Sequence, residues 1–215
     1  MNPFPIILSA PSGGGKTTIA RELLRRRNDL GYSVSCTTRR PRPGEEDGRD
    51  YFFLSLTDFI RERERNAFAE AAEVHGNLYG TLKAEVKRVL SGGKHVIMDI
   101  DVQGAKQFKR AFPDSVTIFV LPPSADVLLE RLRSRRTEDR KQLLARLQSA
   151  LIELQAIDEY EYVVVNDDLE HAIRTVSSII DAEVVSRDRV AGLRHSVASI
   201  IETLQSEISN QDREG

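Results

Sequence analysis

Short apolar runs alternate with amphipathic stretches along most of this chain. Buried strands are predicted where apolar and β-branched residues cluster, at 5–9, 32–38, 95–100, 116–120 and 162–166. Helices are predicted where apolar positions recur every three or four residues, at 17–27, 56–73, 82–90, 125–133, 141–156 and from Ala172 onward. Strands that alternate with helices predict an α/β fold with a mostly parallel sheet covered on both faces.

Two segments are predicted as loops, and the last helix has an unusual pattern. Proline and glycine residues indicate a loop at 40–50, and two glycines indicate a turn at 75–80. The last helix, placed at about 187–209, carries an apolar stripe made of Val190, Leu193, Val197, Ile200, Leu204 and Ile208. Two uses of that stripe stay open: packing on its own domain, or a homo-oligomer contact with another subunit.

A Gly-rich segment follows the first predicted strand directly and opens the first predicted helix. Its sequence, Ala10-Pro-Ser-Gly-Gly-Gly-Lys16-Thr17, nearly matches the phosphate-loop pattern G-x-x-x-x-G-K-[ST]. The glycines let backbone N–H groups curl around phosphate oxygens, Lys16 can reach the β- and γ-phosphates, and Thr17 offers a hydroxyl to Mg²⁺. The predicted ATP-binding residues are Ala10, Pro11, Ser12, Gly13, Gly14, Gly15, Lys16, Thr17 and Thr18. Ala10 replaces the first glycine of the pattern, at a cost of roughly 1 kcal/mol if its φ is positive and none if it is negative.

A carboxylate ends the strand predicted at 95–100. In phosphate-loop proteins an aspartate in that place holds Mg²⁺ or its water shell, so Thr17 and Asp99 are the predicted metal residues. The alternative is an ordinary turn aspartate.

Charge and cysteine content narrow the class of partner. The formal net charge of -2 does not suggest a nucleic-acid binder. Local basic clusters at 39–49 and 131–141 suit a small anionic ligand. Cys36 is the only cysteine, so no intramolecular disulfide forms, and a small buried role is expected for it in a cytoplasmic protein. The apolar runs are too short to span a membrane, and Met1–Pro5 lacks the features of a signal peptide.

Two further segments follow the phosphate loop: Ser35-Cys-Thr-Thr-Arg39-Arg-Pro-Arg42-Pro-Gly-Glu45 with Gly48-Arg-Asp-Tyr51, and Asn77-Leu-Tyr79-Gly80-Thr81. They resemble the first and the second GMP-binding segment of guanylate kinases. The strand-end motifs resemble Asp99-Ile-Asp101-Val-Gln-Gly104 and Asn166-Asp167-Asp168. The family's lid resembles Arg131-Leu-Arg-Ser-Arg135-Arg136-Thr137-Glu138 with Arg146-Leu147. The resemblance spans Ile6 to about Ile180, which is most of the chain.

This resemblance implies a phosphate-loop NTPase-like sheet flanked by helices, with a small GMP-binding lobe and a helical lid. The implied division is a core at 1–34 and 82–186 with a lid at about 131–146, a GMP lobe at 35–81, and a helical extension at 187–215. The implied reaction transfers the γ-phosphate of ATP to GMP, and to dGMP, with Mg²⁺. Lys16, Arg131, Arg135 and Arg146 are implied as catalytic.

The implied GMP-binding residues are Ser35, Arg39, Arg42, Glu45, Tyr51, Glu70, Tyr79, Thr81, Asp99 and Asp101. The chemistry suits them, because forked arginine bonds grip a phosphate dianion and a carboxylate such as Glu70 accepts both N1–H and N2–H of guanine. Arg136 stands where many family members have glycine, which leaves the identity of the phosphate-contacting arginine open. Two other functions also stay open: a kinase of another small acceptor, such as a different nucleotide or ribose bisphosphate, and a non-catalytic guanylate-kinase-like binding module.

Overall fold

The computed structural model describes residues 2–74, 76–133 and 140–214. The chain divides into two compact units, Pro3–Ser177 and a second that consists mainly of Ser178–Gly215. The first unit contains both sheets, both helices of the expected lid and the Gly-rich segment.

A five-stranded parallel sheet forms the centre of the first unit. Its order is β2 (Leu30–Tyr32), β7 (His95–Asp99), β1 (Pro5–Ser9), β8 (Val116–Leu121) and β9 (Tyr162–Val165). Each registered pair of neighbours is parallel. All five residues of β1 are buried, as expected for a central strand covered on both faces. The predicted α/β fold with a parallel sheet is confirmed.

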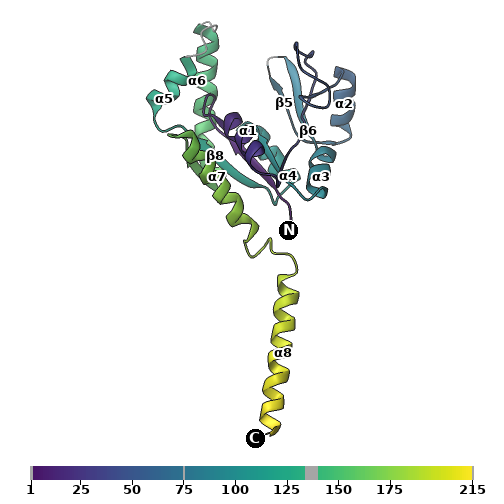
Figure 1. Ribbon diagram of the computed structural model, residues 1–215. Helices are drawn as coiled ribbons and strands as arrows, with labels where there is room; N and C mark the ends of the chain where they lie inside the picture. The colour runs from purple at the N-terminus through teal and green to yellow at the C-terminus, as the bar shows by residue number, and fades with distance from the viewer. Residues whose placement is uncertain (1, 75, 134–139, 215) are drawn as a thin grey trace. The chain divides into compact units, whose positions relative to one another are not determined.

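Helices cover the two faces of this sheet (Figure 1). On one face, Ile7 and Met98 pack in a cluster with Val86 of α3 (Lys83–Ser91) and Phe108 of α4 (Val102–Ala111). Alternate residues of a strand point to opposite faces of the sheet, so Ile6, Leu8 and Ile97 are buried against the helices on the second face. That layer includes α1 (Lys16–Arg26), which packs on β1, β2 and β7.

A second, smaller sheet carries the segment between β2 and α3. Its order is β4 (Phe52–Phe53), β3 (Cys36–Thr37), β6 (Asn77–Leu82) and β5 (Phe68–Val74). Phe59 of α2 (Leu56–Glu64) stacks on Phe68 with ring centroids 4.4 Å apart, and buried Cys36 completes the small core. β5 and β6 lie beside α2 in Figure 1.

The helix predicted over 56–73 is wrong in its second half. Helix α2 ends at Glu64, and Asn66 takes a left-handed backbone with φ of 54°. Lys83 Nζ donates to the carbonyl and side-chain oxygens of Asn66 and holds the turn. The next residues form β5, because antiparallel pairing with β6 and the Phe68 contact outweigh the helix preference of Ala and Glu.

Two other local predictions need correction, and one helix was missed. The run predicted as one strand at 32–38 divides between β2 of the large sheet and β3 of the small one. The turn predicted at 75–80 is shorter, because β6 already begins at Asn77 after Gly76, whose φ is 76°. Helix α4 was not predicted, although Asp101 caps it by accepting from the amides of Gln103 and Gly104.

Two helices form the hairpin in which the lid was expected. Helices α5 (Ala125–Arg133) and α6 (Arg140–Gln155) agree closely with the predicted bounds. They pack through Leu128, Leu132 and Ala150. A short 3₁₀ turn, η1 (Ile157–Glu159), leads from α6 toward β9.

The continuous helix predicted from Ala172 onward is interrupted. Helix α7 (Leu169–Val184) ends well before α8 (Leu193–Glu214) begins. In the connection Arg189 Nε pairs with Glu183 at 2.9 Å, and Gly192 has a φ of 71°, which a right-handed helix does not allow. Among the helices of the described residues, none is both long and apolar enough to cross a bilayer.

Candidate active site

The Gly-rich segment forms a tight loop between β1 and α1. Gly13 and Gly15 have φ values of 85° and 94°, which favour glycine, and the Gly14 amide donates to the Pro11 carbonyl at 2.7 Å. Among the described residues other than glycine, only Asn66 has a positive φ. Ala10 therefore replaces the glycine of the phosphate-loop pattern without backbone strain.

Close packing also explains two of the glycines. A Cβ on Gly14 would lie 2.7 Å from the Cβ of Ala10, and a Cβ on Gly15 would lie 2.5 Å from Nδ2 of Asn166. Asn166 is buried at the end of β9, and its Nδ2 donates to the Gly14 carbonyl at 2.9 Å. Sequence reasoning did not place Asn166 in the site. Its position one residue beyond a parallel strand was the available signal, because such strand ends line sites.

The residues predicted to hold a metal lie together. Thr17 Oγ1, in the first turn of α1, donates to Asp99 Oδ2 at 2.5 Å. Parallel register places Asp99 beside Leu8, just before the loop. A hydroxyl and a carboxylate fit Mg²⁺, which binds few protein oxygens and completes its shell with water and substrate phosphates. Thr18, the next residue, is exposed on α1.

Two of the three arginines expected in the lid form hydrogen bonds with the Gly-rich loop or with Asn166, which contacts the loop. Arg131 Nη2 donates to the Asn166 carbonyl at 3.3 Å, and Arg146 Nε donates to the Ser12 hydroxyl at 3.3 Å. Arg146 Nη1 also donates to the Leu132 carbonyl at 2.9 Å, which links α6 to α5. Arg135 and Arg136 lie outside the described residues.

A carboxylate near the end of α6 also contacts the loop. Glu153 Oε2 accepts from the backbone amide of Ser12 at 2.9 Å. Burial raises the pKa of Glu153, while the Ser12 amide and the nearby charge of Lys16 act in the opposite direction. Sequence reasoning missed Glu153, because a glutamate on an amphipathic helix is usually solvated.

A cleft of about 800 Å³ runs from the loop to the small sheet. Its walls include Lys16, Thr17, Ser35, Arg39, Arg42, Glu45, Tyr51, Glu70, Tyr79, Asp99 and Asp101. The cleft therefore gathers residues from the loop, from the end of β7 and from the small sheet.

Glu70 and Thr81 form a buried polar pair at the cleft wall. Thr81 Oγ1 donates to Glu70 Oε1 at 2.7 Å, and Ser35 Oγ lies 3.4 Å from Thr81 Oγ1. Burial raises the pKa of Glu70, which the Thr81 hydrogen bond opposes and the charge of Asp101 reinforces. A Cβ on Gly104 would lie 3.3 Å from Glu70 Oε2, so glycine leaves room for the carboxylate.

Arginine and tyrosine side chains gather at another part of the cleft. Arg39 Nη2 pairs with Glu45 Oε1 at 2.8 Å, and Glu45 Oε2 accepts from the Arg42 amide at 2.7 Å. The Arg39 hydrogen bond, with that of the Arg42 amide, lowers the pKa of Glu45. The Arg39 guanidinium carbon lies 5.5 Å from the centre of the Tyr51 ring, which meets the Tyr79 ring edge-on at 6.0 Å. Glu45, predicted to bind GMP, thus holds the Arg39 guanidinium and the backbone amide of Arg42 in this structure.

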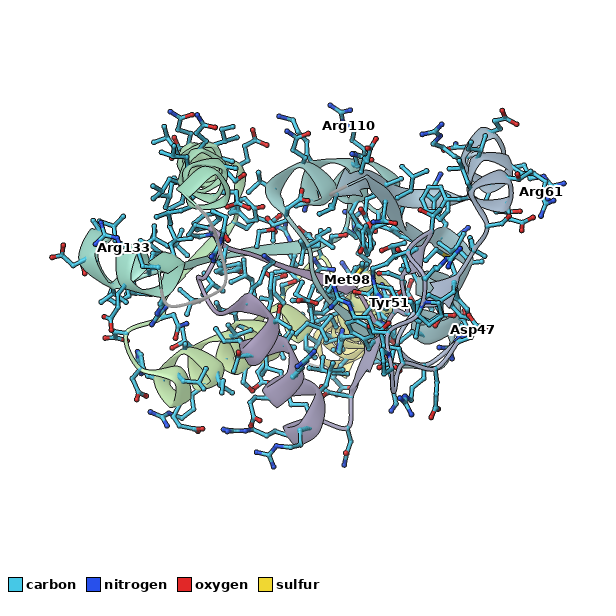
Figure 2. The ribbon with its side chains drawn as sticks, turned by 90° about the horizontal axis from the view of Figure 1, so that it is seen from above. Asp47, Tyr51, Arg61, Met98, Arg110 and Arg133 are labelled. Atoms are coloured by element: carbon cyan, nitrogen blue, oxygen red, sulfur yellow. The ribbon has the colours of Figure 1, made fainter. Side chains whose placement is uncertain are left out.

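Tyr51 lies in different surroundings from exposed arginines such as Arg61 and Arg133. Figure 2 shows Tyr51 toward the middle of the molecule, whereas Arg61 and Arg133 point outward at opposite sides. Burial raises the pKa of Tyr51. Its side chain is partly buried and lines the cleft.

Comparison with known proteins agrees with this arrangement. The family model for guanylate kinase matches residues 2–183. A guanylate kinase of Thermotoga maritima is 48% identical over 177 residues, covering 82% of this chain and 86% of the relative. One from Caldanaerobacter subterraneus subsp. tengcongensis is 45% identical over 184 residues, covering 86% of this chain and 89% of the relative.

A solved structure is also similar to this one. The crystal structure of guanylate kinase from Anaplasma phagocytophilum superposes with a TM-score of 0.73 at 34% identity, covering 92% of this chain and 94% of that one. The match of the family model and the extent of these identities establish that the chain belongs to the guanylate kinase family.

Proposed function

We propose that this protein transfers the γ-phosphoryl group of ATP to GMP, giving ADP and GDP. One observation carries the proposal: Lys16 and Thr17 of the phosphate loop line the same cleft as the buried carboxylate of Glu70. A donor site for a nucleotide triphosphate and a polar pocket for a second small molecule therefore share one space.

On the donor side, the loop would hold the ATP phosphates. The positive φ values of Gly13 and Gly15 curl the backbone so that successive N–H groups converge on an anion. The start of α1 adds the positive end of its dipole, and Lys16 adds a full charge. Mg²⁺, held near Thr17 and Asp99 with the phosphates, would supply charge neutralisation.

On the acceptor side, Glu70 would identify guanine. Guanine presents N1–H and N2–H as two adjacent donors, whereas the corresponding edge of adenine offers no such pair. The hydrogen bond from Thr81 leaves the second oxygen of Glu70 and further lone pairs to accept them. Ser35 and Asp101, which also line the cleft, would complete recognition of the base.

The GMP phosphate would bind where Arg39, Arg42, Tyr51 and Tyr79 line the cleft. Guanidinium groups bind a phosphate dianion with forked, charge-assisted bonds, and tyrosine hydroxyls add neutral ones. Glu45 would orient Arg39 through their 2.8 Å ion pair. Because base and phosphate carry this recognition, we expect dGMP to be an acceptor as well.

The chemical step needs positioning more than proton transfer. An ionised GMP oxygen would attack the γ-phosphorus in line, and the bond to the bridging oxygen of ADP would break. No general base is required for this attack. Lys16 and the lid arginines Arg131, Arg135 and Arg146 would stabilise the charge that spreads over the transferred group.

A coupled ADP-release assay with ATP and Mg²⁺ tests the proposal. GMP, dGMP, AMP, CMP, UMP and ribose bisphosphate are offered as acceptors, with Lys16→Ala as the inactive variant and Arg61→Ala as a surface control. We expect turnover with GMP and dGMP, normal turnover in the control and none in Lys16→Ala. Turnover with another acceptor alone would overturn the assignment of Glu70, and none with any acceptor would favour a binding module.

A further inference from the structure

Helix α8 carries an exposed apolar stripe that the kinase site does not use. Val190 of the stripe predicted from the sequence lies before α8 begins, and Ile201 joins the other members, so the stripe on α8 consists of Leu193, Val197, Ile200, Ile201, Leu204 and Ile208. At 3.6 residues per turn these residues fall within an arc of about 100°. All except the half-buried Leu193 are exposed, from 45% for Val197 to 62% for Ile208. A stripe of this width is typical of a helix that packs against another surface.

The stripe is symmetric about the point between Ile200 and Ile201. Val197 and Leu204 lie equally far from that point, as do Leu193 and Ile208. Two copies of α8 that run antiparallel around a two-fold axis at this point bring each stripe residue opposite another stripe residue. Such an interface is self-complementary, because each residue meets its counterpart from the other half of the pattern.

One pair of opposite charges on α8 follows the same symmetry. Arg194 near the start and Glu207 near the end lie equally far from the midpoint, so an antiparallel pair places them opposite each other, twice per dimer. A parallel pair would instead place like charges together. The first turn of α8 has no acidic residue of its own, and an antiparallel partner brings Glu207 to that positive end of the helix dipole.

We propose that α8 is a self-association surface that pairs antiparallel with α8 of a second copy of this chain. The two-fold axis passes between Ile200 and Ile201. This interaction is separate from the proposed reaction, and neither depends on the other.

Sedimentation velocity of the full chain gives the first test. We expect a dimer for the natural protein, and a dissociation constant raised about tenfold or more in Arg194→Glu, where like charges meet. Adding Glu207→Arg restores opposite charges and should return the constant to near its natural value. A monomer at every concentration would overturn the proposal. A dimer unaffected by Arg194→Glu would place the interface elsewhere.

Disulfide formation gives the second test and reports the direction of pairing. Cys36 is buried, which raises the pKa of its thiol to about 12, so an added cysteine reacts selectively. Val197→Cys mixed with Leu204→Cys should give a mixed disulfide. Neither variant should cross-link alone, because like positions would lie about 10 Å apart along the axis. Cross-linking of each variant with itself, and not with the other, would overturn the antiparallel arrangement.

Discussion

Glu153 Oε2 accepts a hydrogen bond from the backbone amide of Ser12 at 2.9 Å, so helix α6 contacts the phosphate loop directly. Arg146, two turns earlier on the same helix, donates to the Ser12 hydroxyl. Ser12 is therefore held by an anion on its amide and by a cation on its side chain. A displacement of α6 would therefore break both of its hydrogen bonds to this residue of the loop.

Removal of the Glu153 carboxylate should weaken ATP binding selectively. We expect Glu153→Ala to raise the KM for ATP roughly 3- to 10-fold, the loss expected for one hydrogen bond, with little change in the KM for GMP. Glu153→Gln keeps an acceptor for the Ser12 amide and should recover most of the loss. Glu130→Ala, which removes an exposed carboxylate from α5, is the control. Equal changes in both KM values would argue against a contact specific to the loop.

The base-recognition role proposed for Glu70 predicts a defect confined to the acceptor. Glu70→Gln replaces half of the carboxylate with a donor that faces the amino group of guanine. The KM for GMP should rise about 10- to 100-fold, from the loss of charge-assisted hydrogen bonds worth roughly 1.5–3 kcal/mol. Steady-state kinetics should show an unchanged KM for ATP, and a rise in that value as well would contradict the assignment.

GMP affinity should also depend on pH through Glu70. Burial raises the pKa of this carboxyl, so protonation begins at a higher pH than for an ordinary glutamate. The ionised form accepts from guanine, and GMP binding should therefore weaken as pH falls through the raised value. The GMP phosphate also titrates as pH falls, because the second pKa of a phosphate monoester is about 6. Isothermal titration calorimetry across pH, carried out on the natural protein and on Glu70→Gln, separates these two protonation effects. In the variant, GMP affinity should depend on pH only through the GMP phosphate.

Asn166 should act through the phosphate loop. Its amide supports the Gly14 carbonyl, and Asn166→Ala leaves that carbonyl without this donor. We expect a KM for ATP raised about tenfold and a free energy of unfolding lowered by about 1–2 kcal/mol. Asp167→Ala removes the exposed neighbour and should change neither quantity. Chemical denaturation and steady-state kinetics measure the two effects, and an unaffected KM for ATP in Asn166→Ala would leave only a structural role.

Gly104→Ala should separate stability from acceptor binding. Alanine in the first turn of α4 favours the helix by up to about 1 kcal/mol, so the melting temperature should not fall. The new Cβ would lie 3.3 Å from Glu70 Oε2 and displace the carboxylate. We expect a KM for GMP raised several-fold with an unchanged KM for ATP. A lowered melting temperature with normal kinetics would show that the methyl group disturbs the helix and not Glu70.

The phosphate loop and four strands of the large sheet were accessible from sequence because they depend on local patterns. The segment from Ala10 to Thr17 connects a buried strand to a helix, and its glycines have the backbone angles that the loop requires. Helices α5 and α6 and strands β1, β7, β8 and β9 matched their predictions closely, since each has a clear apolar period.

The acceptor side was less accessible because its structure comes from pairing between distant segments. Glu70 was assigned by family resemblance while its segment was predicted as helix, and Ala and Glu do favour helix there. Only pairing of β5 with β6 converts that segment to strand and brings Glu70 to Thr81. The pattern of apolar and polar residues within one segment does not show which distant segment will pair with it.

The sequence by itself determined a parallel α/β core with a phosphate loop, because strand, loop and helix follow one another within a few residues. Tertiary structure decided which side chains meet. It placed Asn166 behind the loop, Glu153 on Ser12, and Gly104 beside Glu70, contacts that join residues far apart in the chain. The physical reason is burial: a polar group removed from water takes whichever partner the packed elements bring within reach.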